Sequence, residues 1–333
     1  MITKTYDYGW GPELETKKFE AEILAAYLRP FAEDSSSTVI VNNTWYSDWA
    51  HAQTVQALEA SRPDRIVLVA MIDAANCHAD RFQPFADDIR SVGYYAGPDE
   101  IDFWALAVDR WLRVPHGDLS DATAIDTPFM CLNRKPHHHR QQLYDAMVAA
   151  GVVDQGLVSM GSRQDGEPAQ RLLPQDTGVS DLNLNPNPGI EQTGIVNDIM
   201  SLGHPDNWRR IFLDVITETQ FNLRKTRFVS EKIYKPILGL RPFLVYARDG
   251  AVPWLTQRGF ETYVLDFQDI TDLDLASYHN MVPFLQILCR QPVSYFQKKL
   301  VDLQPKIQYN RQQFDRYVQQ IQTKVQQGIQ CQI

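Results

Sequence analysis

The stretch TPFMCLNRKPHHHRQQLYDAMVAAGVVDQGLVSM, residues 127–160, places a helical pattern between two short apolar runs. Residues 127–133 and 156–161 have the length and apolar content of buried strands. Between them, residues 139–152 have the pattern of a helix that ends near Gly151. The order strand, helix, strand is typical of a parallel β-α-β unit. This stretch therefore predicts an α/β fold.

The same alternation continues on both sides of this unit. Strands are predicted at 37–45, 65–75, 212–221, 242–247 and 261–267, and helices at 51–61 and 230–240, with 99–114 helical or mixed. Apolar residues at helical spacing from residue 303 onward (Ile307, Phe314, Val318, Ile321 and Val325) predict an amphipathic C-terminal helix. The polar stretch 116–127 is the candidate domain boundary. We expect Rossmann-like domains at 1–122 and 123–300 and a C-terminal helix at 301–333.

Composition limits the possible functions. The chain has 333 residues, 44% of them hydrophobic, and a net charge of −9. This size suits two domains with real cores, and the acidic balance means that any nucleic-acid contact would need a local basic patch. The cysteines (Cys77, Cys131, Cys289 and Cys331) form no CxxC pair, which argues against a disulfide framework or a structural zinc site. With no signal-like N-terminus and no apolar run near the ~18 to 20 residues of a membrane span, we expect a cytoplasmic protein without a membrane partner.

A basic cluster stands out against this acidic background in FVSEKIYKPILGLRPFLVYA, residues 228–247. Ser230 suits a helix N-cap and Glu231 the first helical position. Lys232 and Lys235 do not suit the positive end of a helix dipole, and residues 224–235 hold five basic side chains against one acidic. The pattern predicts that an anion binds here. The same pattern allows an alternative interpretation, in which Glu231 only complements the helix dipole and the lysines form a solvated face.

The familiar cofactor and hydrolase motifs are missing. The chain has no GxxxxGK[ST], no GxGxxG after a strand, no HExxH and no GxSxG. Consecutive histidines at 137–139 point in different directions from a helix start and have no acidic pair beside them, so we expect no metal site. Two interpretations of these histidines stay open. One of them contributes positive charge to a diphosphate site, or all are simply exposed to solvent.

VITET (215–219) followed by the 228–247 segment resembles the nucleotide-sugar half of a family of glycosyltransferases common in tailed and marine phages. More distantly, its Glu-Lys pair resembles that of the α1,3-fucosyltransferases. Residues 130–160 also resemble the segment that opens this domain, in which an Asn and a downstream Arg lead into a helix, as Asn133 and Arg140 do here. The resemblance covers residues 127–268 well and the N-terminal third in outline.

This resemblance implies a GT-B fold, in which two Rossmann-like domains face a cleft and the second binds most of the donor. It implies that Glu231 meets sugar or ribose hydroxyls and that Lys232 meets the diphosphate. The residue types agree, because a nucleotide diphosphate needs cations at the leaving group and a ribose is held well by a carboxylate. The candidate donor-binding residues are Asn133, Arg140, Glu218, Arg224, Ser230, Glu231, Lys232 and Lys235, with Glu218 and Glu231 as alternative ribose ligands.

If the reaction is inverting, a general base must deprotonate the acceptor hydroxyl, and the resemblance to GT-B enzymes implies that this base comes from the N-terminal domain. Asp48 follows the strand predicted at 37–45 and Asp73 ends the strand predicted at 65–75, so both would face the cleft. The two are equal candidates, and a third residue stays open. The long Gly-, Pro- and Asn-rich stretch 162–207 is expected to be a loop that closes over the donor.

The function expected from these observations is transfer of a sugar from a UDP- or GDP-sugar donor to a hydroxyl acceptor, with no metal or other cofactor. The acceptor is open among a hydroxymethylated base in phage DNA, a glycan and a protein. The alternative from another class is a non-catalytic nucleotide-binding or regulatory module.

Overall fold

The computed structural model describes residues 26, 38–43, 59–60, 63–70, 86–93, 101–112, 119–133, 136–161, 169–171, 173, 202, 205–223 and 229–327. The chain divides into two compact units. The first comprises Met1–Leu106, Thr226–Phe228 and Val318–Ile333, and the second comprises Ala107–Lys225 and Val229–Tyr317. The domain limits expected at 122/123 and 300/301 remain predictions.

The first unit contains a parallel sheet of β1 (Thr38–Asn43), β2 (Arg65–Ala70) and β3 (Asp88–Gly93), in that order. Arg65 Nε donates to an Asp88 carboxylate oxygen at 2.5 Å, which ties the first residues of β2 and β3 together. The strands predicted at 37–45 and 65–75 are confirmed over 38–43 and 65–70, and the rest of both ranges lies outside the described residues. β3 was not predicted, because its sequence DIRSVG has no continuous apolar run.

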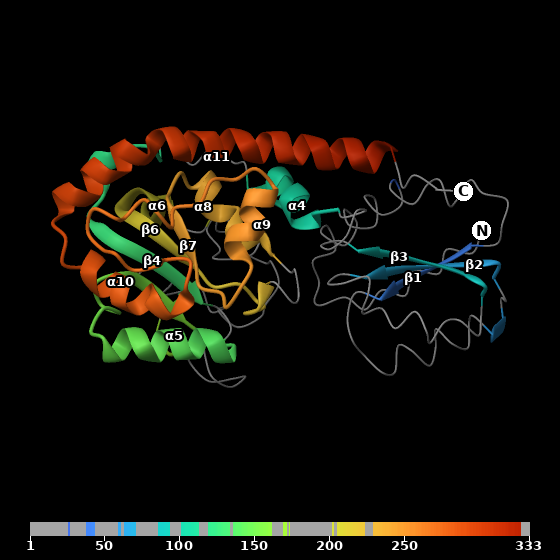
Figure 1. Ribbon diagram of the computed structural model, residues 1–333, viewed down its shortest axis with the longest axis horizontal. Helices are drawn as coiled ribbons and strands as arrows, with labels where there is room; N and C mark the ends of the chain where they lie inside the picture. Colours follow the sequence, from blue (N-terminus) through green and yellow to red (C-terminus); the bar gives the residue numbers. More distant parts are fainter. Residues whose placement is uncertain are drawn as a thin grey trace. The chain divides into compact units, whose positions relative to one another are not determined.

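The second unit is built on a four-stranded parallel sheet (Figure 1). Its strands are β4 (Thr127–Asn133), β5 (Leu157–Met160), β6 (Ile211–Ile216) and β7 (Phe243–Val245), in the order β5-β4-β6-β7. Nearly every residue of β4 and β6 is buried, as expected for central strands covered on both faces. The predicted α/β class is confirmed. Because all four strands are parallel, their carboxyl ends share one edge of the sheet.

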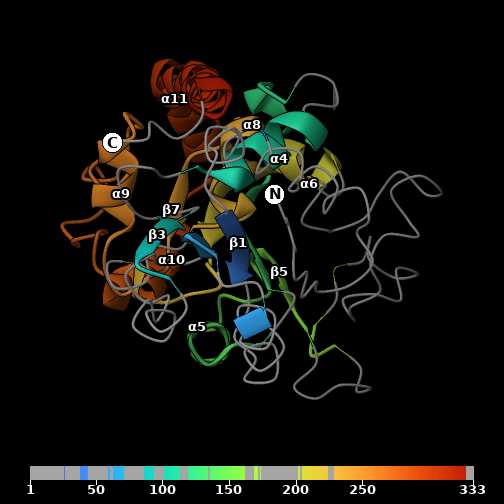
Figure 2. The same ribbon diagram turned by 90° about the vertical axis from the view of Figure 1, so that its right-hand side faces the viewer.

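Helices cover both faces of this sheet (Figures 1 and 2). α5 (His138–Ala149) and α10 (Met281–Leu288) lie on one face. α6 (Pro205–Arg210), α8 (Lys235–Leu238) and α11 (Val293–Gln327) lie on the other. The remaining elements are α4 (Phe103–Trp111), α9 (Ala251–Gln257) and the 3₁₀ turns η3 (Ala122–Ala124), η5 (Glu231–Ile233) and η6 (Tyr278–Asn280).

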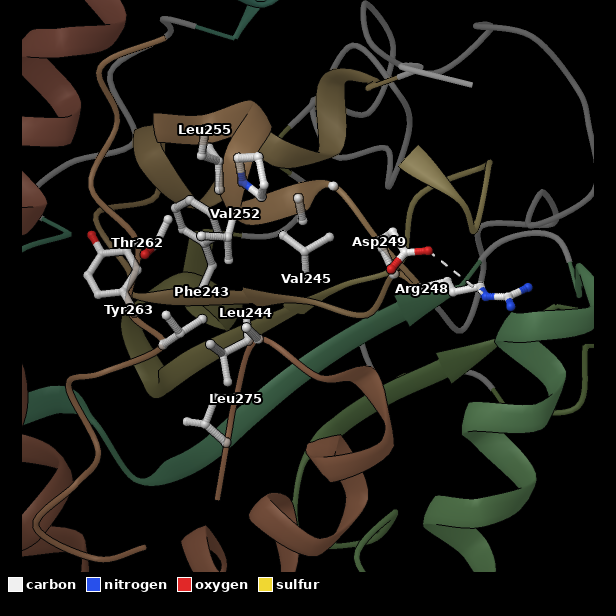
Figure 3. A pocket seen from close by; sticks show the side chains of 16 residues that line it. Phe243, Leu244, Val245, Arg248, Asp249, Val252, Leu255, Thr262, Tyr263 and Leu275 are labelled. Atoms are coloured by element: carbon white, nitrogen blue, oxygen red, sulfur yellow. Dashed lines mark ion pairs between the residues drawn. The ribbon is translucent and has the colours of Figure 1, made fainter. Parts of the chain in front are cut away.

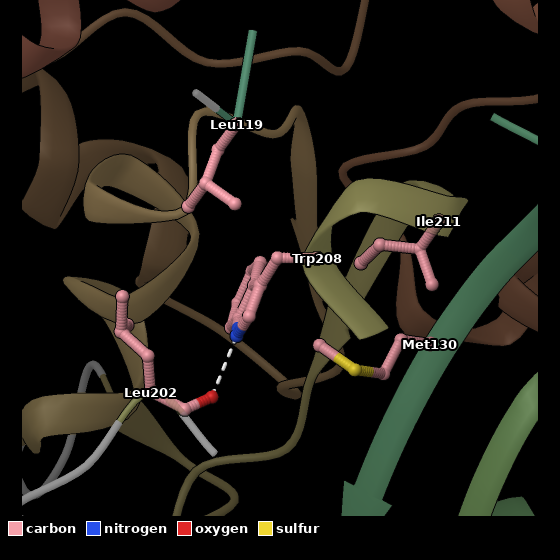
Figure 4. Close-up of a cluster of buried hydrophobic side chains, with 5 residues drawn as sticks. All are labelled: Leu119, Met130, Leu202, Trp208 and Ile211. Atoms are coloured by element: carbon pink, nitrogen blue, oxygen red, sulfur yellow. Dashed lines mark hydrogen bonds between the residues drawn. The ribbon is translucent and has the colours of Figure 1, made fainter. Parts of the chain in front are cut away.

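A cluster around Trp208 fills the space between β4 and α6 (Figure 4). The indole is 1% exposed, and its Nε1–H donates to the carbonyl of Leu202 at 2.6 Å. Gly239, just after α8, packs against this indole so closely that a Cβ atom there would overlap it. The small residue is therefore required by packing. Leu119, Met130, Leu202 and Ile211 complete the cluster.

The helix predicted over 230–240 is not continuous. A 3₁₀ turn at Glu231–Ile233 is followed by a four-residue α-helix that begins at Lys235. Pro236 occupies the first turn of α8, where a proline is tolerated because its missing N–H has no intrahelical acceptor. Elements this short do not build a full macrodipole, so the dipole part of the anion-binding prediction loses its basis.

The strand predicted over 261–267 is wrong, since Val264–Ile270 form turns. Asn310 of α11 explains the difference, because its amide accepts from the N–H of Glu261 at 2.8 Å and donates to the carbonyl of the same residue at 2.9 Å. Lys306 Nζ donates to the carbonyl of Thr262 at 3.1 Å. Side chains of α11 thus occupy the backbone groups that a neighbouring strand would use.

The amphipathic C-terminal helix is confirmed, and it starts at Val293, earlier than the predicted 301. All five apolar residues singled out from their spacing are buried. In the loop predicted over 162–207, residues 205–207 belong to α6, and only 169–171, 173 and 202 of the rest lie among the described residues. Residues 51–58 of the helix predicted over 51–61 are likewise outside the described residues, while 59–60 are helical.

A candidate anion-binding site at the carboxyl ends of the strands

Seven of the candidate donor-binding residues belong to four segments at the carboxyl edge of the second sheet. Asn133 ends β4, Arg140 lies in the first turn of α5, and Glu218 follows β6 by two residues. Ser230, Glu231 and Lys232 form or cap the turn η5, and Lys235 begins α8. The contacts below join these segments into one constellation.

Thr217 connects the ends of β4, β6 and α5. Its hydroxyl donates to the side-chain oxygen of Asn133 at 2.5 Å, and its carbonyl accepts from the Arg140 guanidinium at 2.9 Å. Asn133 also donates to Cys131 Sγ at 3.3 Å. Asn133 is 0% exposed and Arg140 3%, so both are held inside the fold. Thr217 was missed as a candidate residue, although it lies in the VITET segment.

Glu218 braces the turn that carries the Glu-Lys pair. One carboxylate oxygen accepts from the backbone N–H of Ser230 at 3.1 Å, and the other accepts from the Ser230 hydroxyl at 2.7 Å. The second oxygen also faces the N–H of Thr219 at 3.3 Å. Ser230 in turn caps η5 as predicted, by accepting from the N–H of Lys232. Glu218 is 0% exposed, and its oxygens are occupied by the protein.

Lys232 folds back onto the residue before it. Its Nζ lies 2.8 Å from Glu231 Oε1 and 3.0 Å from Ser230 Oγ. The Glu231 side chain is 3% exposed and that of Lys232 26%, so the pair has a buried carboxylate and a half-buried ammonium. An ammonium has three N–H donors, and with these two acceptors among the described residues, one donor is left for an anion.

Counted over the described residues, the constellation is balanced in formal charge. Arg140, Lys232 and Lys235 supply three positive charges; Asp214, Glu218 and Glu231 supply three negative charges when all are ionised. Asp214 was missed as part of this group, although a carboxylate inside the apolar run 211–216 is an unusual feature of the sequence. Of the cations in residues 224–235, the two that the structure describes, Lys232 and Lys235, thus have buried carboxylates opposite them.

Burial and the neighbouring lysines shift the pKa values of the three carboxylates in different directions. Burial raises the pKa of Asp214 to about 7, against a smaller opposing effect of Lys235. Burial also raises the pKa of Glu218, with Lys232 and the Ser230 hydrogen bonds opposing it. At Glu231 burial acts in the same direction, but Lys232 and Lys235 together outweigh it and lower the pKa. Glu231 is therefore the carboxylate that stays charged, and protonation of the other two would leave the constellation cationic.

The three histidines differ in environment. His137 is half-buried and His138 is exposed, whereas His139 is buried and donates its Nε2–H to the carbonyl of Glu218 at 2.8 Å. Burial lowers the pKa of His139, which favours the neutral ring. His139 thus orients the segment after β6 and does not provide the positive charge that the sequence left open.

Three candidate residues, Asp48, Asp73 and Arg224, lie outside the described residues. Among the described residues, no group of three or more His, Cys, Asp or Glu side chains is arranged to hold a metal ion. None of the described helices is both long and apolar enough to cross a membrane.

A cavity of about 150 Å³ lies along the free edge of β7 (Figure 3). Its walls come from β7, the start of α9 and residues 262–264, and Arg248 and Asp249 lie at one end. No candidate donor-binding residue lines it. Residues 262–264, which line the cavity, belong to the stretch 261–267 in which the predicted strand does not form.

No family model, curated protein or solved structure matches the chain.

Proposed function

We propose that the chain is a glycosyltransferase of GT-B architecture, which transfers a sugar from a nucleotide-sugar donor to a hydroxyl acceptor without a metal ion. The observation that carries the proposal is the group of Arg140, Glu231 and Lys232 at the carboxyl edge of a parallel sheet. Ligands of open α/β sheets bind at this edge. Two basic side chains, with Lys235 nearby, and a carboxylate whose pKa is lowered suit an anion that also carries hydroxyl groups.

The leaving group decides where the cations are needed. When the acceptor oxygen attacks the anomeric carbon, the bond from that carbon to the diphosphate oxygen breaks and its electron pair stays on the diphosphate. Lys232 has a donor left for this oxygen or its neighbours, and Arg140 and Lys235 add positive charge nearby. Fixed cations of this kind stabilise the developing charge without a metal.

Glu231 is the proposed ligand of a donor hydroxyl. The Glu218 carboxylate is occupied by Ser230 and Thr219, so of the two alternatives only Glu231 has an acceptor position that a ribose or sugar hydroxyl can use. Glu218 then acts as a positioning residue, because it fixes the turn in which Glu231 and Lys232 are presented.

The acceptor hydroxyl must lose a proton to a base as it attacks. Asp48 and Asp73 remain the two proposed bases. A hydroxymethylated DNA base, a glycan and a protein hydroxyl remain the proposed acceptor classes, and a nucleotide-binding module without turnover is the competing function.

Turnover of the donor tests the proposal. The protein is incubated with UDP-, GDP-, dTDP- and CMP-sugars in EDTA without acceptor, and release of the free nucleotide is followed by chromatography. We expect slow hydrolysis of one donor, reduced at least tenfold in Arg140→Lys because the planar guanidinium is lost. The matched control is Lys298→Ala, which removes an exposed lysine of α11. Nucleotide binding with no turnover would support the non-catalytic module, and activity that returns only with Mg²⁺ or Mn²⁺ would overturn the metal-independent mechanism.

A further inference from the structure

Aromatic rings gather beside the constellation at the same edge of the sheet. Phe221 lies three residues after Glu218, and its ring stacks on that of His139 with centroids 5.2 Å apart and planes 19° from parallel. Tyr246, directly after β7, lies 5.4 Å from Phe221, and Tyr278 of η6 lies 4.9 Å from it. Rings from three other chain segments thus converge on the Phe221 ring.

The cluster is continuous with the polar site. His139, which stacks on Phe221, hydrogen-bonds the carbonyl of Glu218 and precedes Arg140 in α5. The position of Phe221 is fixed from the other side, because its carbonyl accepts from the N–H of Arg248 at 2.8 Å. Two of the rings, those of His139 and Phe221, are therefore held in place by segments that also carry the charged groups.

Its surface is only partly covered. Tyr246 and His139 are buried, whereas Phe221 and Tyr278 are half-buried, so that two ring faces or edges reach solvent. Within the described part of the chain, the phenol oxygens of Tyr246 and Tyr278 have no hydrogen-bond partner. A core cluster would normally bury its rings completely, as Tyr234 is buried against Phe314 at 0% exposure.

We propose that the ring of Phe221 stacks on the nucleobase of the nucleoside diphosphate whose phosphates meet Lys232, and that Tyr278, whose ring stands 79° from that of Phe221, bonds the base edge through its phenol together with Tyr246. This inference rests on the proposed function. A nucleobase has the chemistry that the cluster requires, since it offers a π-face for stacking and polar atoms at its edge. The cation site would then bind the phosphates of a nucleotide, and the aromatic cluster would bind its base.

Calorimetric titration measures separately how the cation site binds phosphate and how the aromatic cluster binds the base. Pyrophosphate, UDP and GDP are titrated into the wild type, Phe221→Leu, Phe221→Trp and Tyr278→Ala. We expect the wild type to bind one nucleotide more tightly than pyrophosphate, and Phe221→Leu and Tyr278→Ala to lose about tenfold or more of nucleotide affinity with pyrophosphate affinity unchanged. Phe221→Trp should keep the preference, because it retains an aromatic face.

The outcomes distinguish this inference from the proposed function. Equal affinity of the wild type for pyrophosphate and both nucleotides, or an unchanged preference in Tyr278→Ala, would overturn the aromatic site and leave the cation site standing. Absence of binding by pyrophosphate and by both nucleotides would overturn both. If Phe221→Leu melts at a much lower temperature, Tyr278→Ala decides, because Tyr278 lies at the half-exposed rim. Tyr309→Ala, at an exposed aromatic residue of α11, is the control for unspecific loss.

Discussion

The ammonium of Lys232 bonds the carboxylate of Glu231, the residue immediately before it, at 2.8 Å. A regular helix would point these neighbours about 100° apart and would let each reach a different part of a ligand. In the 3₁₀ turn they form an ion pair whose carboxylate is buried. Binding of a diphosphate must therefore share this ammonium with Glu231, and the stability of the turn depends on both residues.

Lys232→Met should destabilise the protein, because it leaves a buried carboxylate without its charged partner. The expected loss is about 1 to 3 kcal/mol. The double variant Glu231→Gln/Lys232→Met should lose less than the single variant, because a neutral amide is cheaper to bury than an unpaired charge. Denaturant unfolding of the three proteins measures this, and a double variant less stable than Lys232→Met would contradict the buried ion pair.

Ser230→Ala should cost about 1 kcal/mol through loss of the cap on η5. The same change removes a hydroxyl donor from Glu218, which raises further a pKa that burial has already raised. The unfolded-state pKa of Glu218 is the same in both proteins, so this added defect is absent while Glu218 stays protonated in the fold and grows as pH rises through its raised folded-state pKa. Melting curves at pH 5 and pH 8 test this, with Ser230→Thr as the control that keeps the hydroxyl. A defect equal at both pH values would argue against Glu218 as the partner.

Asp214 should make the protein less stable as pH rises. Its pKa is about 7 in the fold against 3.8 in the unfolded chain, so the cost is absent below 3.8, grows up to about 7 and is then constant. This difference in pKa corresponds to a loss of roughly 4 kcal/mol in the free energy of unfolding above about pH 7. Asp214→Asn should remove this dependence and exceed the wild type in stability at pH 8, whereas Asp302→Asn, at an exposed carboxylate of α11, should not. Parallel stability curves for wild type and Asp214→Asn would refute the assignment.

Gly239→Ala should destabilise the second unit through Trp208 alone. Gly239 has a φ of −74°, which alanine adopts without strain, but a Cβ atom would overlap the indole. We expect a loss of roughly 1 to 3 kcal/mol from overpacking. The change Gly239→Ala should cost less in a Trp208→Phe background, where the smaller ring leaves room, and a double-mutant cycle measures the coupling. Additive effects would show that Trp208 is not the obstacle.

Local patterns were enough to predict most of the second sheet and the face of the C-terminal helix that is buried. The apolar runs at 127–133 and 242–247 and the spacing of Ile307, Phe314 and Val318 need no distant partner to be recognised. Residues 261–267 have the same strand-like composition, but their backbone is taken by side chains of Asn310 and Lys306, which lie more than forty residues away in the sequence. Only the tertiary fold determines that outcome.

Within the candidate site, the residue types could be predicted from the sequence, but the separate role of each residue could not. A carboxylate next to a lysine is visible in the sequence, and Glu231 and Lys232 lie together in the structure. Nothing in the sequence separates the bracing carboxylate of Glu218 from the Glu231 carboxylate beside Lys232, because the difference arises from Ser230, twelve residues downstream of Glu218. The pairing of Thr217 with Asn133 spans 84 residues and depends on the order of the strands.

Calorimetric titration of wild type, Lys232→Ala and the control Lys298→Ala with a nucleoside and its diphosphate examines whether this edge of the sheet holds a donor diphosphate. We predict that Lys232→Ala weakens binding of UDP or GDP about tenfold to a hundredfold, as expected for a lost charge-assisted hydrogen bond, with nucleoside affinity unchanged. Lys298→Ala should match the wild type in both titrations, and the melting temperature without ligand shows that each variant is folded. Equal affinity of wild type and Lys232→Ala for the diphosphate would contradict the assignment.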